Sequence, residues 1–218
     1  MNQSEGMAVL PEKNFESGSH SLLELFGDTG RDNWGVRIPN YQRNYKWKSS
    51  DQISRLQSSI YSNFSTTLAP TFLGSIIFAE QSRTSAHKHI PIDVVDGQQR
   101  LTTLTLFSLA LIVKLAEQKQ KINGMPSLTP DDKDWLQNEL NRSIEDLESF
   151  VFITITVQRI SSLLPRLFRT EDDLQENQTS SQFKSPLASA VLELAKTEPS
   201  DYPKFEFPKA IKDSNEGE

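Results

Sequence analysis

The chain has 218 residues, no cysteine and a formal net charge of −6. This length suits one domain, or one domain with an extension. The lack of cysteine excludes disulfides, thiolate metal sites and cysteine nucleophiles. The acidic balance argues against a wide surface dedicated to gripping DNA, so we expect any DNA contact to be local or shared with another chain.

The ends of the chain and its longest apolar run bear on its location. The first twenty residues suit a flexible arm and lack the basic region and apolar core of a secretory signal. Leu101–Leu115 contains three threonines, a serine and a lysine, so it is too short and too polar to span a bilayer of about 30 Å. We therefore expect a cytoplasmic protein without a membrane partner. Because the sequence stops without a clear fold boundary, we also expect it to be a piece of a longer protein.

A short helix and an extended segment precede the first loop. Ser21 can cap a helix that ends at Gly27. Pro39 keeps Ile38 out of the helical region of backbone space, so the chain is expected to enter the following loop in an extended conformation.

An amphipathic helix is predicted over residues 49–64. Ser49 or Ser50 can cap its start. Apolar side chains recur there at three- and four-residue spacing and fall on one face, namely those of Ile53, Leu56 and Ile60.

Two strands and a long helix are predicted next. Residues 71–80 are rich in β-branched and aromatic types, and a polar loop separates them from a second strand over residues 90–96. We expect the two strands to be neighbours in one sheet, joined by a hairpin-like connection. Leu101–Lys121 is apolar nearly all round, which predicts a helix that lies against the sheet.

The rest of the chain is predicted to be largely helical. Thr129 can cap a third helix that has Pro130 at its first position and runs to Phe150. Residues 151–160 are ambiguous, because they are β-branched enough for a strand but flanked by a helical pattern. A small helix is predicted over residues 185–197.

The segment Asp96-Gly97-Gln98-Gln99-Arg100 forms an elbow between the second strand and the long helix. Asp96 ends the strand and can cap the helix, while Gly97 permits a tight turn and a close backbone approach. The next three residues occupy the first helical turn, where unpaired N–H groups and the helix dipole favour an anion. An arginine there loses roughly a few tenths of a kcal/mol against the dipole, and this loss disappears if it shares a phosphate with the helix terminus.

The polar side chains of the elbow also suit catalysis. The glutamines can orient a water or form hydrogen bonds with a base or sugar. Asp96 can position a metal-bound water or a ribose hydroxyl. The alternative is structural: Asp96 only caps the helix, and Arg100 reaches a surface carboxylate. The residues of the elbow leave both interpretations open.

A second cluster lies in the loop Pro39–Lys48, where aromatic and basic residues are interleaved. This composition offers base stacking together with phosphate neutralisation. The alternative is an exposed basic loop with Trp47 packed into the core, and we assign Trp47 mainly to packing. Tyr41, Gln42 and Arg43 are the candidates for ligand contact.

Three motifs in this order, "IPNYQRNYKW", "FLGSIIF" and "VVDGQQRLTTLTL", resemble the N-terminal domain of the GmrSD-type modification-dependent restriction systems, which is similar to the ParB/sulfiredoxin-like superfamily. The ordered match runs from Ile38 to Leu111. A later segment, "LPRLFRTEDD", resembles the family's arginine-leucine segment followed by an acid. The resemblance implies an α+β fold, with a small mixed sheet packed by helices and followed by a helical extension.

The resemblance also implies a division of the chain. It comprises a flexible arm (1–20), a ParB-like nucleotide-binding core (21–125), a helical extension of the same domain (126–200), and a tail or truncated continuation (201–218).

In proteins of this type the Asp-Gly-Gln-Gln-Arg (DGQQR) motif is associated with binding and hydrolysing a nucleoside triphosphate, coupled to cleavage of modified foreign DNA. The resemblance thus implies GTP, ATP or another triphosphate as cofactor, with Mg²⁺ as a candidate companion and no protein-built metal site. Carried over by position, the implied catalytic residues are Asp96, Gln98, Gln99 and Arg100. The implied nucleotide-binding residues are Tyr41, Gln42, Arg43, Tyr45, Gly97, Arg100 and Arg166.

The family's second half, a histidine-rich HNH nuclease domain, has no counterpart in this sequence. The chain contains only His20, His87 and His89, and no third metal ligand stands near the last two. We therefore expect the nuclease to be a partner chain or another region of a longer protein.

Three functions follow as hypotheses. The first is an NTPase that acts as sensor and regulator in a type IV, modification-dependent restriction or anti-phage defence system. The second is a ParB-like domain that nicks DNA itself. It is disfavoured because, with β-strand alternation, Asp93 and Asp96 point to opposite faces and would not bind one metal together without a bulge. The third is a non-enzymatic module that binds modified DNA.

Overall fold

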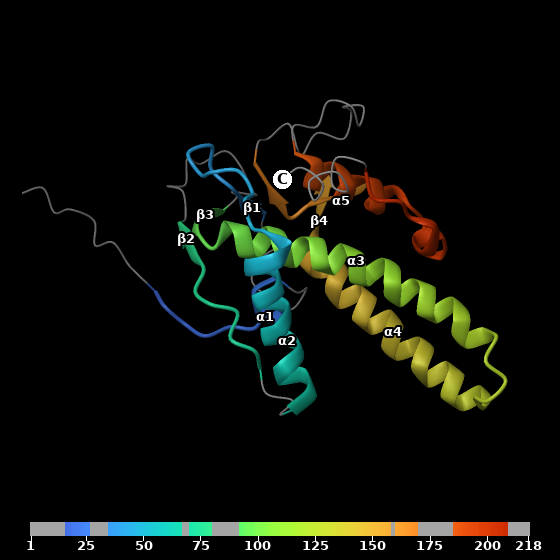
Figure 1. Ribbon diagram of the computed structural model, residues 1–218. Helices are drawn as coiled ribbons and strands as arrows, with labels where there is room; N and C mark the ends of the chain where they lie inside the picture. The colour runs from blue at the N-terminus through green and yellow to red at the C-terminus, as the bar shows by residue number, and fades with distance from the viewer. Residues whose placement is uncertain are drawn as a thin grey trace, which may run out of the picture.

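The computed structural model describes residues 16–26, 35–66, 70–79, 92–157, 160–169 and 185–208. Helices and strands are interspersed along the chain (Figure 1). In chain order the elements are α1 (Leu22–Phe26), β1 (Val36–Arg37), the π-helical turn η1 (Ser49–Ile53), α2 (Ser54–Thr66), β2 (Ile77–Ala79), β3 (Ile92–Asp96), α3 (Gln98–Asn123), α4 (Pro130–Val151), β4 (Phe152–Val157), β5 (Ile160–Pro165), β6 (Leu167–Phe168), α5 (Pro186–Lys196) and the 3-10 helix η4 (Pro199–Lys204).

A small mixed sheet carries the site. Its strand order is β2-β3-β1-β6, with β1 parallel to both β3 and β6, and β2 antiparallel to β3. Val36 lies opposite Ile92 on one side and Leu167 on the other. The sheet therefore joins segments that are far apart in the sequence. The α+β class, with a small mixed sheet packed by helices, is confirmed.

Helix α3 is the centre of the hydrophobic core. Leu109 and Ile112 on this helix are fully buried, as is Val94 on the adjoining strand β3. Each buried side chain of this size stabilises the fold by roughly 1.5–3 kcal/mol relative to exposure. Because α3 begins directly after β3, this packing also fixes the position of the elbow between them.

Helices α3 and α4 form a long hairpin that projects to the right in Figure 1. The Thr129 side chain accepts from the backbone N–H of Asp132, and the Asp132 carboxylate accepts from the Thr129 N–H, which completes a capping box. Pro130 occupies the first helical position. The predicted start of this helix is confirmed. Its far end at Val151 leads directly into β4, so residues 152–157 adopt the strand alternative.

The helix predicted over residues 49–64 is present, but its start differs from the prediction. Lys48 is the cap position, no side chain caps the helix, and a π-helical turn places Ser49 and Ser50 inside it. Neither serine is therefore the N-cap. Leu56 is buried, and Ile60 packs against the core, as their spacing predicts.

The strand predicted over residues 71–80 is much shorter than expected. Only β2 (Ile77–Ala79) pairs with β3, and the pairing is antiparallel, as predicted for neighbours. Gly74 has a φ of 93°, which breaks the extended run, and the Ser75 carbonyl accepts a hydrogen bond from Arg100 instead of from a strand. Residues 70–76 are therefore not part of a strand, and Ile76 lies against Gly97 of the elbow.

The segment after the expected boundary at residue 125 contains strands as well as helices. The segment predicted as a helical extension contributes β6 to the central sheet and the antiparallel pair β4–β5. The expected tail from residue 201 begins inside η4, where Tyr202 is buried against the core. The expected arm is described only for residues 16–20, which are exposed.

Within the described residues, α3 is the one helix that is long and apolar enough, by length and composition, to cross a membrane. As predicted, Gln98–Arg100 form its first turn, and the helix continues to Asn123. Half of its most apolar window is buried inside the protein. The helix packs as the core element of the fold.

Candidate functional site

The elbow turns through Gly97, which lies between the end of β3 and the first residue of α3. Gly97 has φ 91° and ψ 5°, in the left-handed region that favours glycine. A Cβ at this position would lie 3.0 Å from Ile76 Cγ1 and 3.3 Å from the Ile76 Cα. Both the turn and the overlying backbone therefore require a glycine.

The start of α3 has no side-chain cap. Gly97 occupies the cap position, and Asp96 is still paired with Ile77 as the last residue of β3. The prediction that Asp96 caps the helix is therefore wrong. No side chain among the described residues caps the first helical amides, and no acidic residue lies in the first turn.

The loop between β1 and η1 is held against the start of α3 by side-chain hydrogen bonds. Gln99 makes two of them: its Oε1 accepts from the Lys46 N–H at 2.7 Å, and its Nε2 donates to the Asn44 carbonyl at 3.0 Å. Tyr45 and Thr103 share a hydroxyl hydrogen bond of 2.8 Å. These contacts fix the loop over the first turns of α3.

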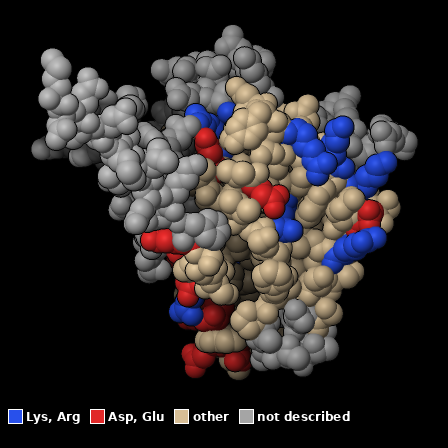
Figure 2. Space-filling view, turned by 90° about the vertical axis from the view of Figure 1, so that its left-hand side faces the viewer, with Lys and Arg blue, Asp and Glu red and all other residues tan. Residues whose placement is uncertain are grey.

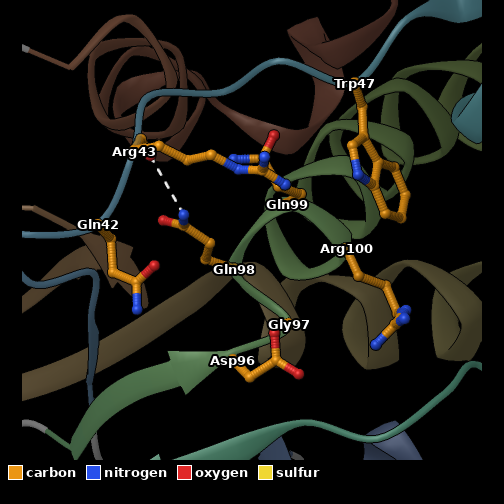
Figure 3. A pocket seen from close by; sticks show the side chains of 8 residues that line it. All are labelled: Gln42, Arg43, Trp47, Asp96, Gly97, Gln98, Gln99 and Arg100. Carbon is orange, nitrogen blue, oxygen red and sulfur yellow. Dashed lines mark hydrogen bonds between the residues drawn. The ribbon is translucent and has the colours of Figure 1, made fainter.

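A pocket of about 500 Å³ opens between this loop and the elbow. Its volume falls within the range of small-molecule sites. Figure 3 shows the side chains that surround it. The lining residues are Gln42, Arg43, Trp47, Asp96, Gly97, Gln98, Gln99 and Arg100.

Gln98 leaves one polar atom of the pocket wall unsatisfied. Its Nε2 donates to the Arg43 carbonyl at 3.2 Å, shown as the dashed line in Figure 3. Because that partner can only accept, the amide nitrogen must face it, and the amide oxygen must face elsewhere. The side chain is 6% exposed, and its Oε1 is buried with no partner in the described part of the chain. Such an acceptor costs roughly 1–3 kcal/mol until a ligand or water donates to it.

Arg100 lies at the opposite side of the pocket from Arg43. Its Nη1 donates to the Ser75 carbonyl at 2.7 Å. The guanidinium packs closely against Gly74: a Cβ added to this glycine would lie 2.7 Å from Arg100 Cζ. In Figure 3 the guanidinium points away from the loop. No carboxylate pairs with Arg100 among the described residues, so the alternative of a surface ion pair does not account for it.

Two of the predicted site residues serve mainly to hold the loop. Both polar atoms of Gln99 are bonded to loop backbone, so this side chain is not free to orient a water. The Tyr45 hydroxyl is bonded to α3, and burial raises its pKa above the ordinary value of 10.0. Neither residue presents a free polar group to a ligand.

Two further predicted residues do not line the pocket. The Tyr41 side chain is 74% exposed on the outer surface of the loop. Arg166 is 6% exposed and donates to the carbonyls of Ser149 and Phe152, at the end of α4. Arg166 therefore lies outside the lining of this pocket, and its guanidinium donates to backbone carbonyls of the fold.

Two residues contribute more than the sequence suggested. Trp47 lines the pocket and also packs against the core, so its assignment to packing is only part of its role. Arg169, just after β6, donates to the carbonyls of Gln42 and Arg43. The arginine-rich segment "LPRLFR" indicated an arginine near the site, but its arginine at the loop is Arg169 rather than Arg166.

The acidic and histidine residues do not assemble a metal centre in the described ranges. Asp93 forms a bidentate pair with Arg37, with distances of 2.7 and 3.0 Å. No group of three or more histidine, aspartate or glutamate side chains gathers among the described residues. His87 and His89 lie outside those residues.

The fold and the site define an α+β domain with a cationic and amide-lined pocket at the start of its central helix. The family model described as GmrSD restriction endonuclease, N-terminal domain, matches residues 22–215. The chain therefore belongs to the GmrSD restriction endonuclease family, as its N-terminal domain. This family makes the chain a component of a type IV, modification-dependent restriction system, and it implies interaction with DNA and a nuclease partner domain. A search of curated proteins returns no match for the chain.

Proposed function

We propose that the domain binds a nucleoside triphosphate in the elbow pocket and hydrolyses it, and that this reaction regulates DNA cleavage by an HNH nuclease domain or subunit. The observation that carries the proposal is the pocket at the uncapped start of α3, between Arg43 and Arg100. We further propose that the domain does so in the cytoplasm, as a sensor of phage or otherwise modified DNA.

The pocket suits a polyphosphate for electrostatic reasons. The first-turn amides and the positive end of the helix dipole attract an anion. Arg43 is exposed on one side of the pocket, and Arg100 lies on the other. Neither arginine is paired with a carboxylate in the described ranges, so both positive charges remain available. Two guanidinium groups and a helix start can stabilise the charge that develops during phosphoryl transfer.

Gln98 is the better of the two glutamines for orienting the attacking water. Its Oε1 has no protein partner among the described residues, whereas Gln99 is fully engaged by the loop. An amide oxygen accepts a hydrogen bond from water and does not itself bind phosphate. We assign the water-orienting role to Gln98 and a positioning role to Gln99.

Asp96 is the carboxylate that fits a magnesium ion in this pocket. It is exposed at the pocket wall, and no ion pair with a lysine or arginine engages it in the described part of the chain. Mg²⁺ is commonly held by one or two carboxylates together with the substrate's phosphates, so a three-ligand protein cluster is not required. The ion would neutralise phosphate charge when bound. Asp96 would orient this ion, or it would accept a proton directly from the attacking water.

The first test measures binding and turnover of the four common nucleoside triphosphates, with and without DNA. Arg100→Ala is expected to raise the Kd at least tenfold, since a charge-assisted contact to phosphate is lost. Arg142→Ala is the matched control, because Arg142 is exposed on α4 and pairs only with Glu139 among the described residues. Both variants should unfold cooperatively. If the unaltered domain neither binds nor hydrolyses any triphosphate under either condition, the proposal fails.

The second test separates binding from chemistry. Gln98→Leu is expected to lower kcat by about a hundredfold while changing KM little, as for loss of a group that positions a reacting water. Equal effects on kcat and on ground-state affinity would instead make Gln98 a ligand contact.

A non-enzymatic module for modified DNA is the second candidate, favoured by the outer surface of the loop. Tyr41 is largely exposed, and Arg43, Lys46 and Lys48 are exposed beside it. Figure 2 shows basic side chains in the upper right part of this side of the molecule. Such a surface would require a steep fall of DNA affinity with salt. A strong salt slope without nucleotide turnover would favour this function over the first.

A further inference from the structure

We propose that Arg169 is a positioning residue of the elbow pocket. It holds the loop backbone at Gln42 and Arg43 in the shape that the pocket requires, and through this backbone it sets the orientation of Gln98. The identity of the ligand rests on the proposed function. The link between Arg169 and the loop backbone, called the tether below, can be tested without any ligand.

Arg169 reaches the loop from a distant part of the sequence. Its Nη2 donates to the Arg43 carbonyl at 2.8 Å, and its Nη1 donates to the Gln42 carbonyl at 3.4 Å. These partners lie 126 and 127 residues away along the chain. Contacts over such separations tie two elements together only after the whole sheet has assembled.

The base of Arg169 is fixed by the sheet. β6 is parallel to β1, with Phe168 opposite Arg37, and the Ile38 N–H donates to the Phe168 carbonyl at 2.8 Å. The loop starts immediately after Ile38. The Arg169 side chain therefore links the end of β6 to the loop that follows the adjacent strand β1.

The contacts of Arg169 also determine how Gln98 is held. The Arg43 carbonyl accepts from both Arg169 and Gln98, at 2.8 and 3.2 Å. A carbonyl oxygen has two lone pairs, so one oxygen can serve both donors. If Arg169 is removed, the carbonyl can turn away, and Gln98 then loses the acceptor that keeps its amide oxygen directed elsewhere.

The Arg169 hydrogen bonds also make the pocket more favourable for an anion. The carbonyls of Gln42, Arg43 and Asn44 all accept from side chains outside the loop. A carbonyl oxygen that turned into the pocket would repel a phosphate, and a donor that holds it elsewhere removes this repulsion. Arg169 contributes two of these hydrogen bonds and adds a positive charge beside the loop.

A purely stabilising role makes a different prediction. It would lower the melting temperature without changing the loop more than other regions, and it would act additively with changes at Gln98. A positioning role acts through Gln98, so the two substitutions should be strongly non-additive.

The first measurement is amide hydrogen exchange of the domain without nucleotide. The Lys46 and Gln42 amides are bonded to Gln99 Oε1 and the Pro39 carbonyl, and they report on the loop. Arg169→Ala is expected to speed their exchange about tenfold, with no change in the α3–α4 hairpin. Arg169→Lys, which keeps the charge but cannot reproduce the forked contact, should give an intermediate increase. Arg142→Ala should give none. Unchanged loop exchange in Arg169→Ala would overturn the proposal.

The second measurement is a double-mutant cycle on triphosphate hydrolysis. Arg169→Ala is expected to lower kcat at least tenfold, and the double variant Arg169→Ala/Gln98→Leu should be no slower than Gln98→Leu alone. If the fold decrease in kcat of the double variant equals the product of the two single decreases, Arg169 does not act through Gln98 and the proposal is overturned on this point. If the unaltered domain shows no triphosphate activity, the proposed function fails, while faster loop exchange in Arg169→Ala would still establish the tether.

Discussion

The two long helices of the hairpin differ in how their ends are finished. α4 starts with a capping box at Thr129 and ends under Arg166, whose guanidinium donates to the Ser149 and Phe152 carbonyls. α3 starts at a left-handed glycine without a side-chain cap, and its first turn contains an arginine and no acid. Side chains therefore form hydrogen bonds with backbone groups at both ends of α4. At the start of α3, beside the pocket, no side chain of the described residues caps the backbone amides.

This difference separates stability from function within one hairpin. A side-chain cap contributes roughly 0.5–2 kcal/mol relative to alanine but only a few tenths of a kcal/mol relative to glycine, so α3, with Gly97 at the cap position, forgoes roughly a few tenths at its N-terminus. The unpaired Oε1 of Gln98 lies at the same place. Local rules are broken together at this one end, and functional sites are where such violations are expected. α4 then serves as an internal reference for what the sequence does when only stability is required.

The largest effect is expected from removing the guanidinium that closes the end of α4. Arg166→Met should lower the free energy of unfolding by about 3 kcal/mol, because buried carbonyls lose charged donors. Arg166 also lies over the Phe26 ring, at 5.7 Å from its centroid. Urea unfolding measures the loss, with exposed Arg142→Met as the control. Reduced triphosphate affinity at unchanged stability would instead restore Arg166 as a ligand residue.

The next effect concerns the glycine at the open start of α3. Gly97→Ala should cost about 2 kcal/mol, since a left-handed alanine is strained and its Cβ crowds Ile76. The same substitution should weaken triphosphate binding, because it displaces the elbow.

Gly124→Ala provides the matched control at the other end of the same helix. Gly124 has φ −86°, and an added Cβ would meet its nearest atom, the Lys121 carbonyl oxygen, at 3.6 Å. This substitution should be neutral or slightly stabilising. Equal losses for Gly97→Ala and Gly124→Ala would show that the elbow imposes no special requirement.

A smaller effect is expected at the closed start of α4. Thr129→Ala should lower the free energy of unfolding by about 1 kcal/mol, because it removes the side-chain half of the capping box. Thr129→Ser retains the oxygen and should retain most of the stability. Neither change should alter triphosphate binding, since this helix start lies outside the pocket. Thermal unfolding and a binding titration on the same samples provide both readouts.

The sequence predicted the features that depend on local chemistry. The start of α4, the apolar nature of α3 and the antiparallel neighbours β2 and β3 follow from capping residues, periodicity and strand composition. The elbow motif and the loop were also singled out, and they line one pocket. These features need only neighbours along the chain or a turn of known type.

The features that the sequence did not reveal depend on distant partners. Arg166 and Arg169 are three residues apart in one segment, yet the first closes α4 and the second holds the loop. Gln98 and Gln99 are adjacent, yet only Gln99 has both polar atoms bonded. Composition cannot distinguish such pairs, because the distinction arises from the register of β6 and from the path of the loop. The short β2 has the same kind of cause, since Arg100 takes the Ser75 carbonyl.

The smallest effect at neutral pH is expected at the hydrogen bond that links η4 to α4, and the effect becomes larger in alkali. The Tyr202 hydroxyl donates to Glu148 Oε1 at 2.7 Å, and the side chain is 4% exposed. Burial, followed by the bond to Glu148, raises the pKa of Tyr202 above its ordinary value of 10.0. The folded state therefore favours the neutral phenol, and its contribution to stability is fully present below pH 10 and is lost as the pH rises above 10.

Tyr202→Phe tests this contribution directly. At neutral pH it should cost about 0.5–1 kcal/mol for the lost hydrogen bond. Above pH 10 its stability should fall less steeply than that of the unaltered domain, because no phenol remains to ionise. Tyr61→Phe is the control, since Tyr61 is exposed on α2. Parallel pH profiles for Tyr202→Phe and the unaltered domain would mean that η4 is not held to α4 through this hydroxyl. The comparison between α4, whose ends are bonded to side chains, and the uncapped start of α3 would then depend only on the capping box at Thr129 and on the Arg166 hydrogen bonds.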